Sequence, residues 1–276
     1  MRLGGSRVSD LISELELLVV NGVGRSGTSA LTQALGTRPD VANPGIGEAP
    51  FLYFFIDFLI SYEDLHPHRK YHLACYTLPR DELQALFRST LFQSGAGVEP
   101  PSVNINSKFV VAKTIPDASN ITKFREIFPG LRLFYLVRNG IEVVASSVKF
   151  FRDPSMDFEH ACRNWTREII AHQPLFRSDF CAVIRHEELI RDPAKVFSAA
   201  FERLKLPDDP SPAKFISKRL VNSSFGEQRD SIDVTRVFNS RQSPWALWSG
   251  RERTIFVDLC GSTMELLGYS LPSRHS

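Results

Sequence analysis

The residues with the clearest chemistry in this chain lie in a glycine-rich turn near its start. An apolar run at residues 17–20 leads into residues 21–29, NGVGRSGTS, and a helix-forming segment follows at 30–35. A strand, a glycine-rich turn and a helix in this order direct backbone N–H groups and the helix dipole at an anion, usually a phosphate. The sequence therefore predicts a phosphate-binding loop.

The spacing within this loop differs at one position from that of nucleoside-triphosphate P-loops. Gly22, Gly27 and Ser29 stand where that motif requires them, but Thr28 occupies the place of the lysine and the cation is Arg25. We therefore expect the loop to bind a phosphate without holding an ATP γ-phosphate and its magnesium in the usual way.

A second candidate anion site follows another predicted strand. Residues 131–137 end in Arg138, and Ser146 lies eight residues later in the next helix. Ligands of open α/β sheets bind beyond the carboxyl ends of the strands, where Arg138 is expected. Taken alone, Arg138 is explained by a surface ion pair and Ser146 by a solvent-facing helix position. Beside the loop, they favour two anion sites for one ligand.

Strand and helix patterns alternate along most of the chain. Short apolar runs predict strands, and helical patterns lie between them. The strands are expected at 16–21, 109–112, 131–137 and 181–185, and the helices at 29–35, 118–128, 141–151, 158–176, 193–204 and 251–267, the last ending at Gly268. This order predicts an α/β, three-layer P-loop-type fold in one domain, residues 1–276, with a central parallel sheet and helices on both faces.

Two segments interrupt the alternation. Residues 36–106 are rich in aromatics and prolines without a clear strand, and we interpret them as a lid or acceptor-binding insertion. Residues 207–244 are polar and rich in turn formers, which predicts a long loop over the site.

Composition limits the partners and the compartment. A net charge of +2 gives no general basic field, so nucleic acid is not an expected partner. Four cysteines without a CxxC pair favour reduced thiols and a cytoplasmic location, with disulfides left open. The first 16 residues lack the apolar core of a signal peptide, and the apolar window 51–62 is too short for a membrane span. Oligomeric state is left open.

In these motifs the chain resembles the sulfotransferases that use 3′-phosphoadenosine-5′-phosphosulfate (PAPS). Residues 24–29 are similar to the family's 5′-phosphosulfate loop, and Arg138 with Ser146 to its 3′-phosphate element. Segments 113–116, KTIP, and 184–193, IRHEELIRDP, also resemble the family in order and place. The pattern is most similar to the protein-tyrosine, Golgi-type and bacterial branch, although the region 51–106 matches no acceptor-binding pattern.

The resemblance implies roles for individual residues. Sulfuryl transfer needs aligned reactants, neutralised oxygens and one proton acceptor. Glu48 is implied as the general base, Lys113 as a cation at the sulfuryl group, and Arg25 as a bidentate contact to the phosphosulfate. Their alternatives are a helix start for Glu48 and a surface position for Lys113. The implied donor contacts are Gly24, Arg25, Ser26, Gly27, Thr28, Ser29, Arg138, Ser146 and, on the late loop, Arg241.

No metal is expected. His66, His68 and His72 cluster, but Pro67 interrupts a helix that would align them, and no cysteine or carboxylate pair completes a site. We interpret this segment as a solvated loop whose histidines are the next candidates for the base.

The function expected from this resemblance is transfer of a sulfuryl group from PAPS to the hydroxyl of a saccharide, lipid or secondary metabolite. Two alternatives come from other classes. A P-loop kinase for a small metabolite would need magnesium and a loop lysine, and Thr28 argues against it. A non-catalytic nucleotide-binding protein would need neither Glu48 nor Lys113.

Overall fold

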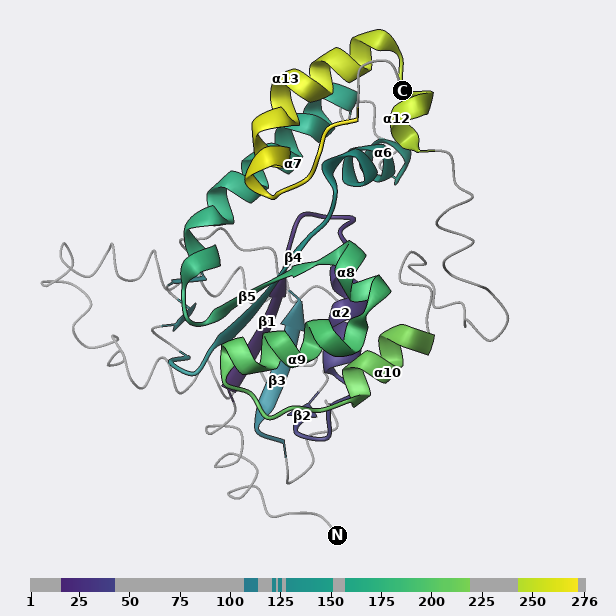
Figure 1. The fold of residues 1–276 in the computed structure, drawn as a ribbon. Coiled ribbons are helices and arrows are strands. Elements are labelled where there is room, and N and C mark those ends of the chain that lie inside the picture. Colours follow the sequence, from purple (N-terminus) through teal and green to yellow (C-terminus); the bar gives the residue numbers. More distant parts are fainter. Residues whose placement is uncertain are drawn as a thin grey trace, which may run out of the picture.

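A parallel sheet forms the centre of the protein (Figure 1). The computed structural model describes residues 16–42, 107–113, 121–122, 124–125, 128–150, 157–218 and 243–272. Within them, five strands pair in the order β2-β3-β1-β4-β5, and every pair is parallel. The strands are β1 (Glu16–Asn21), β2 (Val41–Ala42), β3 (Phe109–Lys113), β4 (Arg132–Val137) and β5 (Cys181–Arg185).

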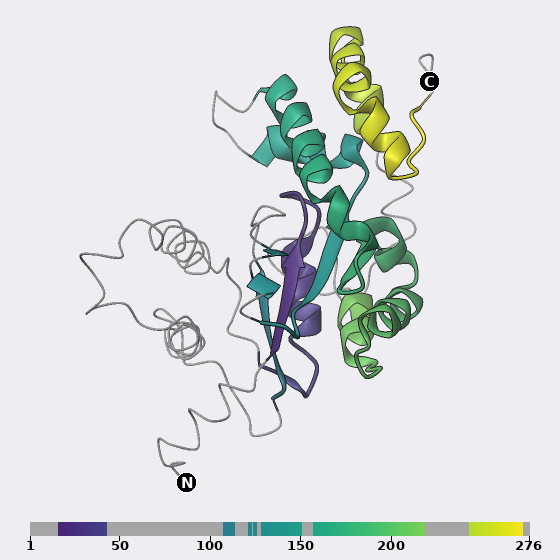
Figure 2. The same cartoon turned by 90° about the vertical axis from the view of Figure 1, so that its left-hand side faces the viewer.

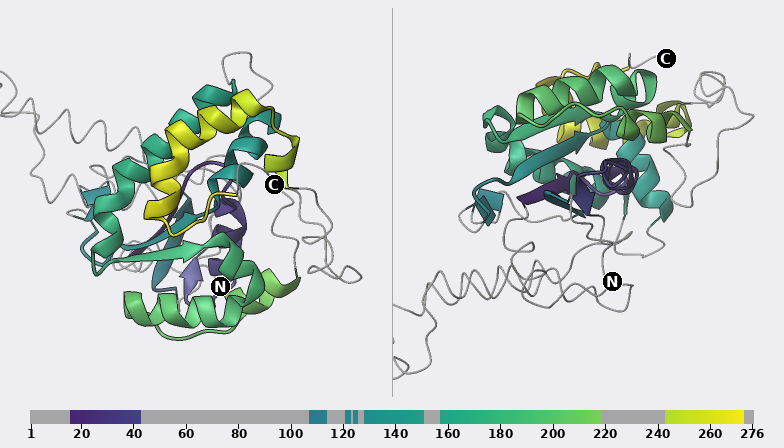
Figure 3. Two further views of the ribbon diagram at one scale, coloured as in Figure 1. Left: turned by 45° about the horizontal axis from the view of Figure 1, so that its top comes forward. Right: turned by 90° about the horizontal axis from the view of Figure 1, so that it is seen from below.

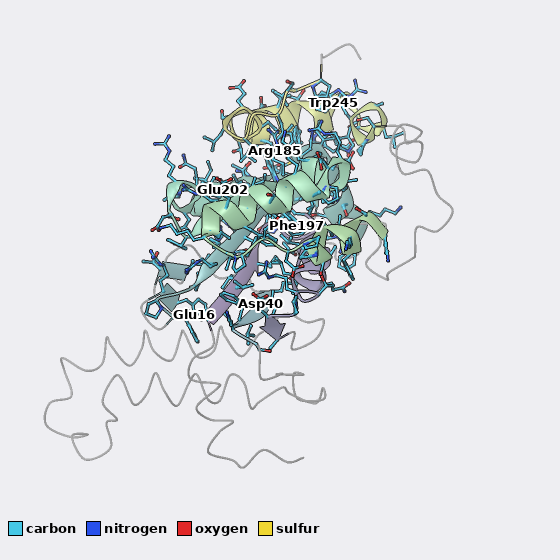
Figure 4. The ribbon with its side chains drawn as sticks, turned by 60° about the horizontal axis from the view of Figure 1, so that its bottom comes forward. Glu16, Asp40, Arg185, Phe197, Glu202 and Trp245 are labelled. Carbon is cyan, nitrogen blue, oxygen red and sulfur yellow. The ribbon has the colours of Figure 1, made fainter. Side chains whose placement is uncertain are left out.

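The parallel arrangement brings the candidate site residues to one edge of the sheet. Val20 pairs with Lys113 on one side of β1, and Val137 pairs with Arg185 across β4 and β5. The carboxyl ends of β1, β3, β4 and β5 therefore lie together. Figure 4 shows Glu16, at the amino end of β1, far from Arg185 at the carboxyl end of β5.

Helices cover both faces of the sheet, because alternate strand residues point to opposite sides. On one face, Leu17, Val19 and Tyr135 belong to a core shared with helices α7 (Phe158–His172) and α13 (Gly250–Leu266). On the other face, Leu18 and Val20 belong to a core shared with helices α2 (Thr28–Leu35), α9 (Pro193–Leu204) and α10 (Ser211–Lys218). Figures 2 and 3 show the sheet between these groups, with α7 beside α13. The predicted three-layer α/β fold is confirmed.

Helix boundaries agree with the sequence pattern where caps are strong. Asp192 accepts a hydrogen bond from the Lys195 amide ahead of Pro193 in the first turn of α9, and Gly268 follows α13 with φ of 70°. The described helices are α2 (Thr28–Leu35), α6 (Gly140–Phe150), α7 (Phe158–His172), α8 (His186–Arg191), α9 (Pro193–Leu204), α10 (Ser211–Lys218), α12 (Pro244–Leu247) and α13 (Gly250–Leu266), with a 3₁₀ turn, η1 (Gln173–Arg177).

Parts of the two interrupting segments are ordered into elements that the sequence pattern did not predict. Helix α10 lies inside the predicted loop 207–244, because Ala213 and Ile216 are buried against the α2–α9 core and Pro212 is tolerated in the first helical turn. Strand β2 lies inside the segment 36–106. Residues 43–106 and 219–242, which carry the predicted lid and most of the predicted loop, lie outside the described residues.

The predicted helix 158–176 is shorter than expected. Helix α7 ends at His172, and Pro174 lies in η1, because proline has no N–H to continue the α-helical bonding. Cys162, Cys181 and Cys260 are free and buried. Among the described residues, no helix combines the length and apolarity that crossing a bilayer requires.

We predict that Gly22→Ala destabilises the protein strongly. Gly22 has φ of 152°, and a Cβ at this position would collide with the carbonyl oxygen of Leu136 in β4. The free energy of unfolding, from urea denaturation followed by circular dichroism, should fall by about 2 kcal/mol or more. Gly24→Ala is the matched control: its Cβ would meet nothing within 4 Å, so its effect should stay within about 0.5 kcal/mol. Equal losses in both variants would contradict this account of the turn.

Candidate functional site

The glycine-rich turn has the backbone of an anion-binding loop. Arg25 has φ of 71° and Gly27 has φ of 100°, and the Ser26 amide donates to the Val23 carbonyl at 3.1 Å. Gly27 is the N-cap of α2 and no side chain caps this helix end, so the positive end of the helix dipole is available to a ligand. The predicted strand, turn and helix are confirmed.

Ser26 supplies an independent sign of a ligand at this turn. Its hydroxyl oxygen is buried and has no hydrogen-bond partner among the described residues. Buried hydroxyls without partners are costly, so such an atom needs an explanation. An anionic oxygen cradled by the turn would satisfy it, which means that the residues present fit a phosphate-type group.

Arg138 joins the loop to the second predicted anion site. Its side chain is 12% exposed, and its guanidinium donates to the carbonyl oxygen of Arg25 at 3.0 Å and to Glu142 Oε2 at 3.2 Å. Burial lowers the pKa of Arg138, while the carboxylates of Glu142 and Glu187 act in the opposite direction. The charge is therefore held in place by carboxylates on one side and presented toward the loop on the other.

The two predicted anion sites are in direct contact. Arg25 Nε lies 3.3 Å from Ser146 Oγ on α6, and the Arg25 guanidinium packs 4.0 Å above the ring centroid of Phe150 on the same helix. Burial, followed by the charge of Arg138, lowers the pKa of Arg25. Two guanidinium groups and a serine from separate elements thus surround one region at the carboxyl edge of the sheet.

Lys113 also reaches the loop. It is the last residue of β3, and its Nζ donates to Ser29 Oγ at 3.2 Å. This contact places a third cation next to the start of α2. Thr28, the first residue of α2, is buried, with its carbonyl accepting from the Thr32 hydroxyl at 2.9 Å.

Glu187 supports the Arg138 segment, and the sequence analysis did not single it out. Its carboxylate accepts from the Asn139 amide at 2.8 Å and from the Tyr269 hydroxyl at 2.8 Å. Arg185 packs over the Tyr269 ring at 4.2 Å and donates to the Gly268 carbonyl at 3.3 Å. Figure 4 shows Arg185 between the green helices and α13. A carboxylate two residues after the end of β5 was the available signal in the sequence.

His186 packs against the loop as a neutral, buried side chain. A Cβ on Gly27 would lie 2.9 Å from the imidazole Cδ2, so the close approach requires glycine there. Burial, and secondarily the charge of Arg138, lower the pKa of His186 to about 3. Its Nε2 has no hydrogen-bond partner among the described residues.

Other predicted site residues fall outside the described part of the chain. Glu48, Arg241 and the histidines at 66, 68 and 72 belong to this group. Within the described ranges, no cluster of three or more histidine, cysteine or acidic residues could hold a metal ion.

The chain matches one family of known proteins over most of its length. A profile described as the sulfotransferase family matches residues 18–210, more than half of the chain. The chain therefore belongs to the sulfotransferase family, the class of PAPS-dependent enzymes that its two anion-binding motifs predicted. Among curated proteins, the comparison finds no match to this chain.

Solved structures show the same fold at low sequence identity. The sulfotransferase domain of the curacin biosynthetic pathway is 15% identical with a TM-score of 0.51, covering 94% of this chain and 99% of that one. The sulfotransferase domain of the Synechococcus PCC 7002 olefin synthase is 16% identical with a TM-score of 0.52, covering 93% and 95%. Mouse sulfotransferase SULT7A1, complexed with PAP, is 12% identical with a TM-score of 0.52, covering 95% and 90%.

We predict that His186 makes the protein less stable in acid. Its native pKa lies below the ordinary value of 6.5, so the unfolded chain takes up a proton that the native protein does not as pH falls from 6.5 toward 3. The free energy of unfolding should lose up to about 1.4 kcal/mol per pH unit in that window from this group. His186→Phe should flatten this part of the profile, measured by urea denaturation at each pH. The exposed His160→Gln is the control and should leave the slope as it is; an unchanged slope in His186→Phe would refute the assignment.

Proposed function

We propose that this sulfotransferase moves the sulfuryl group of PAPS to the hydroxyl group of a small-molecule or saccharide acceptor. The observation that carries the proposal is the contact between the two anion-binding segments: Arg25 lies 3.3 Å from Ser146, and Arg138 donates to the Arg25 carbonyl. A ligand with one anionic group at the loop and another at Arg138 matches this pair. PAPS is such a ligand, and the PAP complex of mouse SULT7A1 supports the choice.

In this proposal, the loop holds the 5′ end of the donor and α6 holds the 3′-phosphate. The amides of residues 24–29 and the start of α2 receive the 5′-phosphosulfate, together with the Ser26 hydroxyl. Arg138 and Ser146 receive the 3′-phosphate. Arg241 closes over the 3′-phosphate and adenine, as the family resemblance implies.

Bound PAPS supplies an activated sulfuryl group. The chain's own residues then neutralise charge and accept one proton. Lys113, held at Ser29 beside the loop, is placed to offset negative charge on the transferring oxygens. Arg25 offers a planar pair of donors, which a lysine does not. Glu48 accepts the proton of the acceptor hydroxyl.

The cytoplasmic location stays a prediction.

Donor recognition can be tested by ligand-induced thermal stabilisation. We expect 3′-phosphoadenosine-5′-phosphate (PAP) to raise the melting temperature and ATP with magnesium to raise it far less, because only a ligand of the native state stabilises it. Arg138→Met should weaken PAP binding at least about tenfold and 5′-AMP binding by less, because both ligands lose the loop contact of Arg138 with the Arg25 carbonyl and only PAP also loses a contact to the 3′-phosphate.

Arg163→Met is the matched control for Arg138→Met. Arg163 is an exposed arginine on α7 paired with Glu159, so its loss should leave the PAP affinity unchanged. Stabilisation by ATP with magnesium alone would overturn the proposal in favour of a kinase. Stabilisation by PAP without sulfuryl transfer to any hydroxyl acceptor would favour a non-catalytic nucleotide-binding protein.

The proposed base is tested by Glu48→Gln. The amide keeps the size of the side chain but cannot take up the proton, so kcat should fall about 10²- to 10⁴-fold with PAP affinity unchanged. Transfer of ³⁵S from PAPS should be measured on an acceptor that the wild type sulfates, selected from phenols, sugars and sterols. His72→Gln is the comparison variant. If Glu48→Gln retains full kcat and His72→Gln loses it, the base is in the histidine segment.

A further inference from the structure

Two buried polar side chains form a hydrogen bond next to the start of the loop. Asn21, the last residue of β1, and His172, the last residue of α7, are each 1% exposed, and Asn21 Nδ2 lies 3.1 Å from His172 Nε2. The four β1 residues before Asn21 are all buried and apolar. A single amide at the end of this apolar run, paired with an imidazole 151 residues away, needs an explanation beyond core packing.

The partners on either side fix the direction of the hydrogen bond between Asn21 and His172. Asn21 Oδ1 accepts from the Gly22 amide at 2.6 Å, so the NH₂ group of Asn21 faces His172. His172 Nε2 must then accept. His172 Nδ1 lies 2.7 Å from the Glu168 carbonyl oxygen, which only accepts, so Nδ1 carries the hydrogen. The hydrogen-bond partners thereby favour the tautomer of His172 that carries its hydrogen on Nδ1.

These hydrogen bonds connect α7 to Gly22, the residue where the loop begins. Gly22 has φ of 152° and lies against the β4 backbone at Leu136, so its orientation determines the direction in which residues 23–27 leave the sheet. Its amide is held by Asn21, and Asn21 by His172. The His172 ring is held in turn by the Tyr135 ring, with centroids 5.1 Å apart at 34°.

We propose that Asn21 and His172 are positioning residues for the donor loop. Desolvating two polar side chains is costly, and apolar residues of the same size would fill this space at least as favourably. What the polar pair adds is orientation: it sets the Gly22 amide and, through it, the loop backbone that meets the donor. The inference rests on the proposed assignment of residues 24–29 to the 5′ end of PAPS.

The test separates loop positioning from stability. His172→Phe keeps a ring against Tyr135 but removes the acceptor for Asn21. It should weaken PAP binding about tenfold by isothermal titration calorimetry, the size expected for losing one buried hydrogen bond. His172→Gln restores an acceptor and should bind PAP within about threefold of the wild type.

Tyr135→Phe is the matched control. The Tyr135 hydroxyl donates to the same Glu168 carbonyl at 3.5 Å, but it makes no hydrogen bond to Asn21 in the described structure. Tyr135→Phe should lower the melting temperature while leaving PAP affinity within about twofold of the wild type. PAP affinity of His172→Phe equal to the wild type, or an equal loss in Tyr135→Phe, would overturn the proposal.

A second measurement needs no variant. Long-range ¹H–¹⁵N correlation NMR of the wild-type protein should show His172 with hydrogen on Nδ1 and a lone pair on Nε2. The opposite tautomer would overturn the hydrogen-bond chain. Failure of the wild type to bind PAP would refute the donor assignment instead, and the tautomer measurement would still stand on its own.

Discussion

The hydrogen bond from Arg138 to the carbonyl oxygen of Arg25 is the interaction on which the site depends. It holds the end of β4 against the glycine-rich turn, so that two cations lie next to each other in a partly buried region. Burial lowers the pKa of both arginines, and the charge of Arg138 lowers the pKa of Arg25 further. A ligand that carries negative charge to both places relieves the cost of burying these charges. The contact is therefore a structural reason for binding a doubly anionic donor.

Two carboxylates hold the Arg138 segment in place through hydrogen bonds. Glu142 accepts a hydrogen bond from the Arg138 guanidinium. Glu187 accepts hydrogen bonds from the Asn139 amide and from the Tyr269 hydroxyl. The segment that follows α13 thus contributes to the position of Arg138 through Tyr269, although it supplies none of the proposed donor contacts. Fixed partners of this kind reduce the reorganisation that a polar site undergoes when its ligand binds.

Steric contacts limit the loop as much as hydrogen bonds do. Gly22 lies too close to β4, and Gly27 too close to His186, for any side chain to be accommodated at either position. Next to Gly22, Asn21 and His172 form a buried polar contact between the end of β1 and α7. Close packing at the two glycines and the Asn21 side-chain amide therefore restrain the loop in addition to the hydrogen bond from Arg138 to the Arg25 carbonyl.

The sequence by itself determined the loop, the Arg138 segment and the alternation of strands and helices, because each is a local pattern. Residues 16–29 form strand, turn and helix within one contiguous stretch, and the apolar runs of β1, β3, β4 and β5 indicate burial on both faces of a sheet. The family followed from these motifs in order. Helix α10 was missed because Ser211 and Pro212 are as typical of a turn as of a first helical turn.

Only the tertiary structure decided which of these residues meet. The contacts of Lys113 with Ser29, of Arg25 with Ser146 and of Asn21 with His172 span 84, 121 and 151 residues of sequence. Side-chain type and spacing do not determine which atoms of such pairs meet, because that geometry depends on strand order and on helix packing against the sheet. The same holds for the neutral state of His186, since its pKa is set by burial and by Arg138, a neighbour 48 positions away in the sequence.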